Sequence, residues 1–484
     1  MISSNNYIVF TILNSIFLFY AIAIALTYTV LALLSLYEMR RYVGKANVSD
    51  YKSILASPLA PGISLLAPAY NEGLTIINNV KSLLSIMYNN IEVIIINDGS
   101  KDDTLQKLIE AFCLVKVPFH VRGDLHTKKV LGVYKSKNRA FKKLTVVDKV
   151  NGGKADALNV GINISTKALV ACIDVDCIIE RDALLKMVKP YLEETKTVIA
   201  SGGVVRVANS CVVEEGRLLE VRLAEKQVVR FQALEYIRSF LVGRMAWSRL
   251  NGLLLISGAF GLFRKDIVIK AGGYNPNTVG EDMELVVRMR VYMHQHKQPY
   301  KVVYIPEPLC WTEVPSDYGL LGRQRNRWTR GTFETLKLHK NIFFNPKYGL
   351  MGMLSYPFWL FFEWLAPLIE FAGMAFMILL LALGKINFPN SLSLFVAIYA
   401  FAFLVSMTAL LGEEFSYYQY KRKRDIMKLV LIALIEPIVF HPRVVWWAIL
   451  GNLDLLKGKK AWGEMTRQGF MPYPMPKERN LIKV

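Results

Sequence analysis

The N-terminal part of the chain is apolar and carries no charge. No Asp, Glu, Lys or Arg occurs from Met1 to Tyr37, and this stretch exceeds the roughly 20 apolar residues that cross a bilayer as a helix. A signal peptide has a shorter apolar core, a positive start and a small-residue cleavage site, which this stretch lacks. We therefore expect residues 1–40 to form a retained transmembrane helix.

Further apolar stretches lie near the C-terminus. Residues 391–412 predict a second crossing, and residues 371–384 predict another if the preceding segment joins the helix. That segment contains Glu363 and Glu370, and acids within a membrane usually face protein or a wet cavity. The last apolar stretch, 429–452, is broken by an acid and two prolines. We expect a broken hairpin there, with a single crossing as the alternative.

Basic residues beside these stretches predict their orientation, because cytoplasmic loops carry an excess of Lys and Arg. The sequence "EMRRYVGK" follows the first stretch, and "YKRKRDIMK" follows residues 391–412. We therefore expect a multi-pass protein of the plasma (inner) membrane with its N-terminus outside. Residues 55–345 would form a cytoplasmic domain, residues 346–458 interfacial and transmembrane helices, and residues 459–484 a basic cytoplasmic tail.

The net charge and the cysteine content are consistent with a membrane protein that has a cytoplasmic domain. The net charge of +20 is typical of a protein beside anionic lipid, and a share of it suits a polyanionic ligand. The basic residues are dispersed and form no nucleic-acid-binding motif, so we expect no nucleic acid partner. The five cysteines lack the paired spacing of a zinc site, and we expect them to be core thiols in a reducing compartment.

Strand and helix patterns alternate between the apolar ends of the chain. Buried strands are predicted at 63–67, 91–97 and 144–148 and within 168–176, with helices between them. This alternation predicts an α/β fold with a mainly parallel, Rossmann-like sheet covered by helices. The polar motifs "PAYNEG", "NDGS", "NGGK" and "DVD" each follow a strand. They should meet at the carboxyl edge of the sheet, where such folds bind ligands.

The last predicted strand ends in two acids that need a partner. Asp174 and Asp176 interrupt an apolar run, and burying an unpaired carboxylate is costly. Side chains alternate along a strand, so both acids should share a face. Two carboxylates beside a lysine and loop amides suit Mg²⁺ and a diphosphate, because Mg²⁺ is typically held by one or two carboxylates and substrate phosphates. A solvated turn is the alternative, and the apolar flanks argue against it.

Seven motifs occur in a diagnostic order: "PAYNE", "NDGSKDDT", "NGGKADALN", "DVD", "SGAFGLFR", "GEDMEL" and "QRNRW". In this order they resemble the membrane-embedded, processive family 2 glycosyltransferases, which include cellulose, chitin, hyaluronan and poly-N-acetylglucosamine synthases. The resemblance covers about residues 60–470. It implies a GT-A glycosyltransferase domain that transfers a sugar, with inversion, from a nucleotide donor that is commonly UDP-activated.

The resemblance also implies roles for donor-binding residues. Tyr70, Glu72 and Asp98 should line the uridine pocket. Lys154 should meet the donor diphosphate as a point charge. Asp176 should be the direct ligand of Mg²⁺ or Mn²⁺, and Asp174 should contact the nucleotide sugar or the metal.

The same resemblance implies a general base in "GEDMEL". Asp282 matches the acid that takes the proton from the acceptor hydroxyl as it attacks the donor. Glu281 and Glu284 are rivals for this role.

The motif "QRNRW" matches the Q-x-x-R-W motif of processive members. Gln324 and Arg327 should orient the diphosphate and the acceptor end, and Trp328 should stack on the terminal sugar. An interfacial aromatic residue with flanking arginines is the alternative.

Several functions remain open at this point. We expect transfer from UDP-GlcNAc, or next from UDP-glucose, to a growing β-linked glycan, coupled to its passage across the bilayer. Alternatives are a single transfer to a lipid or polyprenyl-phosphate acceptor, a hyaluronan-type or glucan synthase, and a non-catalytic membrane scaffold. Accessory export proteins are possible partners.

Overall fold

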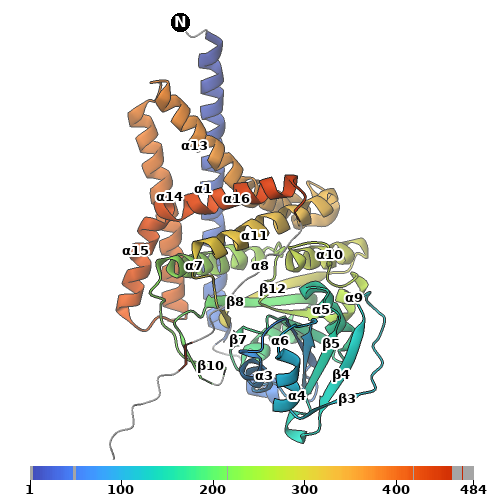
Figure 1. The fold of residues 1–484 in the computed structure, drawn as a ribbon. Coiled ribbons are helices and arrows are strands. Elements are labelled where there is room, and N and C mark those ends of the chain that lie inside the picture. The colour runs from blue at the N-terminus through green and yellow to red at the C-terminus, as the bar shows by residue number, and fades with distance from the viewer. Residues whose placement is uncertain (1–3, 47–50, 215, 418, 460–470, 473–484) are drawn as a thin grey trace, which may run out of the picture.

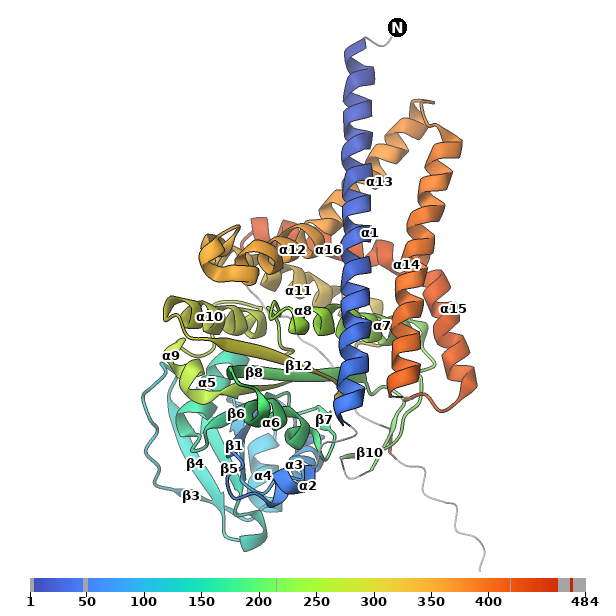
Figure 2. The same cartoon turned by 180° about the vertical axis from the view of Figure 1, so that it is seen from behind.

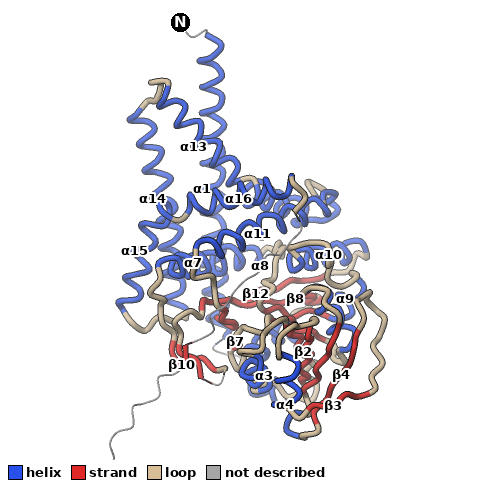
Figure 3. Tube along the Cα trace, viewed as in Figure 1, coloured by secondary structure: helices blue, strands red, loops and turns tan. Residues whose placement is uncertain are grey.

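A computed structural model describes residues 4–46, 51–214, 216–417, 419–459 and 471–472. Figures 1 and 2 show a sheet with its helices at one end of the molecule and long helices at the other. Figure 3 shows the strands gathered at the first of these ends. The basic tail expected at 459–484 lies almost wholly outside the described residues.

The main sheet has ten strands in the order β3-β4-β5-β2-β1-β6-β11-β8-β12-β7. Strands β5, β2, β1 and β6 are parallel neighbours, and so are β8 and β12, whereas β3, β4, β7 and β11 pair antiparallel. The expected parallel centre is therefore confirmed, with antiparallel additions. The strands are β1 (Ile63–Ala69), β2 (Ile91–Asn97), β3 (Leu114–Val117), β4 (Val130–Ser136), β5 (Leu144–Lys149), β6 (Leu169–Ile173), β7 (Ile178–Ile179), β8 (Thr197–Val207), β11 (Phe260–Arg264) and β12 (Tyr300–Thr312).

A small second sheet has the order β10-β9-β13. Its strands are β9 (Val212–Glu214), β10 (Arg217–Glu220) and β13 (Met471–Pro472).

Helices connect and cover the main sheet, as the alternation predicts. They are α2 (Tyr51–Ala56), α3 (Ile76–Leu84), α4 (Thr104–Ala111), α5 (Lys154–Ile164), α6 (Ala183–Glu193), α7 (Gln227–Arg238), α8 (Met245–Arg249), α9 (Lys265–Lys270), α10 (Glu281–Gln295) and α11 (Tyr318–Leu338). Helix α3 begins at Ile76. The residues before it form a turn, in which the Gly73 amide donates to the Asp102 carboxylate at 3.0 Å.

Three described helical segments are long and apolar enough to cross a membrane: Phe10–Gly44, Met351–Ala382 and Phe388–Ser416. They match the expected crossings, and the segment before α13 (Ala366–Ala382) does join the helix. The first segment belongs to α1 (Ser4–Ala46) and the third is α14.

The broken hairpin expected at 429–452 is wrong. Helices α15 (Lys423–Val439) and α16 (His441–Leu456) continue one another with a bend of 49°, whereas a hairpin would reverse the chain. Figure 1 shows α16 running across the direction of α1.

Two ion pairs that involve a buried acid join the sheet region to the long helices. Arg206 of β8 pairs with Glu413 near the end of α14, and both side chains are buried. Arg238, the last residue of α7, pairs with Glu436 of α15 and also donates to Ser406 of α14 at 2.9 Å. The sheet region and the long helices are therefore joined by ion pairs whose carboxylates are buried.

The cysteines lie mostly where expected. Cys172, Cys177, Cys211 and Cys310 are buried, but Cys113 is exposed. Cys113 directly follows the C-cap of α4 with a φ of 50°, so it is a surface residue and not a core thiol.

Candidate functional site

One cavity of about 1440 Å³ brings the predicted site residues together. It lies where the carboxyl ends of the parallel strands meet α10, α11 and the long helices. Apart from Glu284, a rival for the base, every residue to which the sequence assigned a role lines this cavity: Tyr70, Glu72, Asp98, Lys154, Asp174, Asp176, Glu281, Asp282, Gln324, Arg327 and Trp328.

The loop before α5 is held by Asp98. This carboxylate is buried and accepts hydrogen bonds from the amides of Gly152 at 2.9 Å and Gly153 at 2.8 Å. It also pairs with the buried Lys149. Gly153 has a φ of 86°, a conformation that favours glycine. Asp98 therefore fixes the start of α5, where Lys154 is the first residue.

The "PAYNEG" loop is held by the motif that follows β2. The Asn71 amide donates to the Ser100 hydroxyl at 3.0 Å, and the Glu72 amide donates to the Thr104 hydroxyl at 2.9 Å. The Tyr70 side chain remains 46% exposed. The loop is thus fixed by its backbone, and Tyr70 presents its ring at the cavity.

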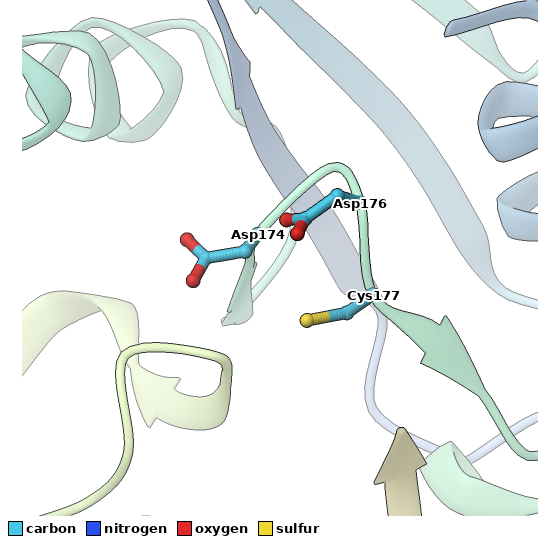
Figure 4. A group of neighbouring side chains, drawn as sticks. All are labelled: Asp174, Asp176 and Cys177. Carbon is cyan, nitrogen blue, oxygen red and sulfur yellow. The ribbon is translucent and has the colours of Figure 1, made fainter. Parts of the chain in front are cut away.

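The two acids of "DVD" lie on a turn after β6 rather than on the strand itself. The Cys177 amide donates to the Asp174 carbonyl at 3.0 Å, and the Asp174 amide donates to the Ala259 carbonyl. Figure 4 shows Asp174, Asp176 and Cys177 pointing to the same side. Carboxylate oxygens of the two acids and the Cys177 sulfur all lie within 4.8 Å of one another. The expected closeness holds, but the turn causes it and strand alternation does not.

This donor set fits a divalent cation. Carboxylate oxygens are the ligands that Mg²⁺ and Mn²⁺ prefer, and the spacing of the two acids permits a shared ion. Asp176 is buried, whereas Asp174 is partly exposed and faces the cavity. Cys177 adds a softer atom beside them.

Lys154 links the two acidic parts of the site. Its ammonium forms an ion pair with Asp174 and donates to the Gly258 carbonyl at 3.1 Å. Burial alone would lower the pKa of Lys154, but the charges of Asp174 and Glu281 outweigh it and raise this pKa above its usual value. Lys154 is therefore a fully charged cation among carboxylates.

Helix α10 begins with the acids of "GEDMEL". Asp282 accepts hydrogen bonds from the amides of Gly258 at 3.0 Å and Met283 at 2.8 Å. Glu281 is buried, and this burial, followed by the charge of Asp282, raises its pKa to about 7 against the lowering effect of Lys154. Both acids line the cavity.

Glu284, the other rival for the base, has a different environment. It is buried and pairs with Arg288 at 2.7 Å and with His339 at 3.1 Å. These partners hold the pKa of Glu284 below its usual value, although burial opposes them. Glu284 does not line the cavity described above, so it stabilises α10 and α11 instead.

Helix α11 carries "QRNRW", and Arg325 within it was missed by sequence reasoning. Its guanidinium lies 4.2 Å from the centre of the Trp328 ring and donates to both oxygens of Glu235, at 2.7 and 2.8 Å. Arg325 thereby fixes the orientation of the 41% exposed Trp328 ring. The sequence alone could not pair Arg325 with Glu235, because the two residues meet only through tertiary packing.

Two glycines set the distance between α10 and α11. A Cβ atom added at Gly331 would lie 2.8 Å from the Gly280 Cα atom, and one added at Gly280 would lie 2.8 Å from the Gly331 Cα atom. The backbones therefore touch at this point. This contact places the first turn of α10, with Asp282, beside the cavity face of α11.

The chain is similar to curated proteins that carry a name. Poly-beta-1,6-N-acetyl-D-glucosamine synthase of Staphylococcus epidermidis is 29% identical over 275 residues, which are 57% of this chain and 55% of that protein. The synthase of the same name from Staphylococcus aureus (strain COL) is 28% identical over 276 residues, with the same coverage. The chain thus spans about half the length of the curated relatives it matches.

A solved structure shares the fold. Mannosyltransferase PcManGT from Pyrobaculum calidifontis, in complex with GDP-Man and Mn²⁺, has a TM-score of 0.50 and 16% identity. The match covers 87% of this chain and 98% of that chain. Residues 61–331, more than half of the chain, match the family model described as glycosyltransferase like family 2. The chain therefore belongs to the family 2 glycosyltransferases and has the GT-A fold.

Proposed function

We propose that the chain transfers a sugar from a UDP-sugar to the end of a growing β-linked polysaccharide, with inversion at the anomeric carbon. UDP-GlcNAc is the first candidate donor, because the relatives at 28–29% identity are named as poly-beta-1,6-N-acetyl-D-glucosamine synthases. UDP-glucose is the second. The acceptor is the growing end of the glycan, which the "QRNRW" motif suits.

The observation that carries this proposal is the continuity of the cavity. The same cavity is lined by Tyr70 and Lys154 at the sheet edge and by Tyr28, Glu363 and Pro367 of the membrane-side helices. A donor site for a soluble sugar nucleotide alone needs no such extension. A glycan that grows toward the membrane would fill it.

The donor half of the cavity suits a nucleoside diphosphate. The exposed Tyr70 ring offers a stacking surface for uracil, next to Glu72. Asp98 contributes chiefly by holding the amides of Gly152 and Gly153, so its role is to position the loop that leads to Lys154. We assign the diphosphate to Lys154 and Arg327.

Asp176 and Asp174 would hold Mg²⁺ or Mn²⁺. A structural neighbour with Mn²⁺ bound and the two close carboxylates of this chain support a metal requirement. When bound, such an ion offsets the negative charge of the departing diphosphate.

Asp282 acts as the general base in this proposal. It takes the proton of the acceptor hydroxyl while that oxygen attacks the anomeric carbon and the bond from this carbon to the diphosphate breaks. UDP then leaves with the electron pair of the broken bond. Asp282 suits this role because backbone amides fix both of its oxygens. Glu281 remains the rival, since its pKa of about 7 is near neutral pH.

In this proposal, Trp328 and Arg325 form the part of the cavity that binds the acceptor sugar. Sugar rings have an apolar face that packs on aromatic rings, and Trp328 is exposed at the cavity. The Arg325 guanidinium packs over the Trp328 ring. Gln324, which lines the same cavity, would bind a hydroxyl group of the terminal sugar.

The test is a panel of UDP-sugars offered to the full chain in detergent with Mn²⁺ or Mg²⁺. We expect UDP release with UDP-GlcNAc and a product series of increasing length. Release of UDP with a product of one added sugar on a polyprenyl phosphate would favour the single-transfer alternative. No UDP release from any of the UDP-sugars, with folded protein, would overturn the proposal.

We further propose that the cytoplasmic domain faces the inner side of the plasma membrane and that the glycan passes along the membrane-side helices. Of the acids in these helices, Glu436 pairs with Arg238, and Glu370 contacts His441 at 2.7 Å. Glu363 accepts from the Tyr28 hydroxyl at 3.2 Å and lines the cavity. Glu363 therefore has the position to bind glycan hydroxyl groups.

Reconstitution in sealed vesicles tests this passage. The catalytic domain faces outward, and donor is added outside. Polymer protected in the lumen would support passage through this chain. Polymer found only outside, with the enzyme active, would assign export to accessory proteins.

A further inference from the structure

The ammonium of Lys154 is paired with one of the two carboxylates proposed to bind the metal. It forms a direct ion pair with Asp174, and its second contact is the Gly258 carbonyl at 3.1 Å. The Gly258 amide in turn donates to Asp282 at 3.0 Å. One lysine thus bridges the "DVD" turn and the start of α10.

The surroundings of Lys154 are strongly acidic. Besides Asp174, the carboxylates of Glu281 and Asp282 are near enough to act on it electrostatically. All of these side chains line the same cavity. Without the lysine charge, this group of acids would attract another cation.

We propose that Lys154 is an internal cation that competes with the divalent metal for Asp174. The inference rests on the proposed function, in which both a metal and a UDP-sugar bind here. In the donor-free protein the ammonium neutralises Asp174 and repels a second cation, so metal binding is weak. The donor diphosphate attracts Lys154 and frees Asp174 for the metal.

The local structure allows this exchange without a movement of the backbone. Lys154 has a long flexible stem and is partly exposed to the cavity. The residues before it are fixed, because Asp98 holds the amides of Gly152 and Gly153. The exchange is therefore confined to the lysine side chain.

The consequence is that metal and donor bind cooperatively. If the diphosphate raises metal affinity by a factor, the metal must raise donor affinity by the same factor. A protein with Lys154 intact would bind metal poorly alone and well with UDP.

The experiment measures Mn²⁺ binding without nucleotide, by the electron paramagnetic resonance signal of free Mn²⁺, using the full chain in detergent. We expect Lys154→Met to bind Mn²⁺ about 10- to 100-fold more tightly than the unmodified protein. This range follows from removing one positive charge about 4 Å from a doubly charged ion in a solvated site. Lys154→Arg keeps the charge and should bind Mn²⁺ as weakly as the unmodified protein.

A matched control is available in the same cavity. Lys128 lines it, is exposed, and donates from its ammonium to the Asn151 carbonyl at 2.8 Å. Lys128→Met removes one charge but leaves Asp174 paired, so Mn²⁺ affinity should stay within about threefold. Asp174→Asn in the Lys154→Met background should abolish the gain, which locates the bound ion.

Unchanged or weaker Mn²⁺ binding by folded Lys154→Met would overturn the exchange and leave the proposed function standing. The unmodified protein gives a second test that needs no variant: equal Mn²⁺ affinity with and without UDP would also overturn it. If no Mn²⁺ binds even with UDP, both the exchange and the proposed metal site fail.

Discussion

We expect the replacement of Asp282 with asparagine to separate catalysis from donor binding. Both carboxylate oxygens of Asp282 accept hydrogen bonds from backbone amides, those of Gly258 and Met283. Asparagine has nearly the same shape but one acceptor oxygen, so one of these amides loses its partner. It also cannot take a proton at neutral pH.

The two effects have different sizes. One unsatisfied amide at a half-buried position costs about 1 kcal/mol of folding free energy, at the low end of the range for buried groups. Loss of a general base lowers the transfer rate by about 10² to 10⁴, which corresponds to about 3–5 kcal/mol in the activation free energy. The Asp282→Asn protein should therefore fold and bind UDP but transfer sugar very slowly.

The assay measures UDP release under saturating donor and acceptor, and UDP affinity by calorimetry. We expect the rate constant to fall by about 10² to 10⁴, while the Kd for UDP changes by less than about threefold. Glu281→Gln is the matched comparison, because it is the same kind of change in the same turn of α10. It should cost less activity than Asp282→Asn.

Two results would refute the reasoning. If UDP affinity falls as much as the rate, Asp282 serves donor binding and is not the base. If Glu281→Gln is the slower variant, and the unmodified enzyme loses rate below a pH of about 7, the base is Glu281, whose pKa is raised to about 7.

The remaining predictions concern the metal, pH and the junction of the two regions. Asp176→Asn should abolish Mn²⁺-dependent donor binding and nearly all turnover, and full activity in excess chelator would contradict the metal assignment. The raised pKa of Glu281 means that the folded state holds its proton more tightly than the unfolded state. The ionisation of Glu281 should therefore lower the free energy of unfolding by about 3 kcal/mol as the pH rises from 4.5 to 7. Denaturant titrations across this range check it. If the free energy of unfolding of Glu281→Gln depends on pH as steeply as that of the unmodified protein, the prediction is wrong. Arg206→Met should cost about 3–5 kcal/mol by leaving Glu413 buried and unpaired. The double variant Arg206→Met/Glu413→Leu should recover most of that stability, and no recovery in unfolding measurements would argue against a direct pair.

The sequence predicted the centre of the sheet because its signals are local. Residues 91–97 form β2 as predicted, since an apolar run is stopped by a turn motif. The polar motifs meet because the ends of neighbouring parallel strands share one edge. The convergence of "DVD" and "NGGK" needed no knowledge of distant contacts.

The missed elements depend on distant partners. Strand β8 contains two glycines and the buried Arg206, which weaken its strand pattern. It is stabilised by pairing with β12, about a hundred residues later in the chain. The Arg206–Glu413 pair likewise joins segments that only the folded chain brings together.

The turn at "DVD" shows a different limit. The sequence predicted that Asp174 and Asp176 lie close together, but it assigned the cause to strand alternation. Strand β6 ends at Ile173, one residue before Asp174. The Asp174 amide donates to the Ala259 carbonyl at this point. That partner comes from the "SGAF" segment, whose position no local pattern specified.

The contact between Gly280 and Gly331 bears on how such an enzyme could be altered. Because the two backbones touch, no side chain lies between them whose size could be varied to adjust the spacing of α10 and α11. The spacing between Asp282 on α10 and Trp328 on α11 therefore depends on this backbone contact. A side chain introduced at either glycine would therefore push α10 and α11 apart, and in the proposed function this would shift Asp282 relative to the acceptor.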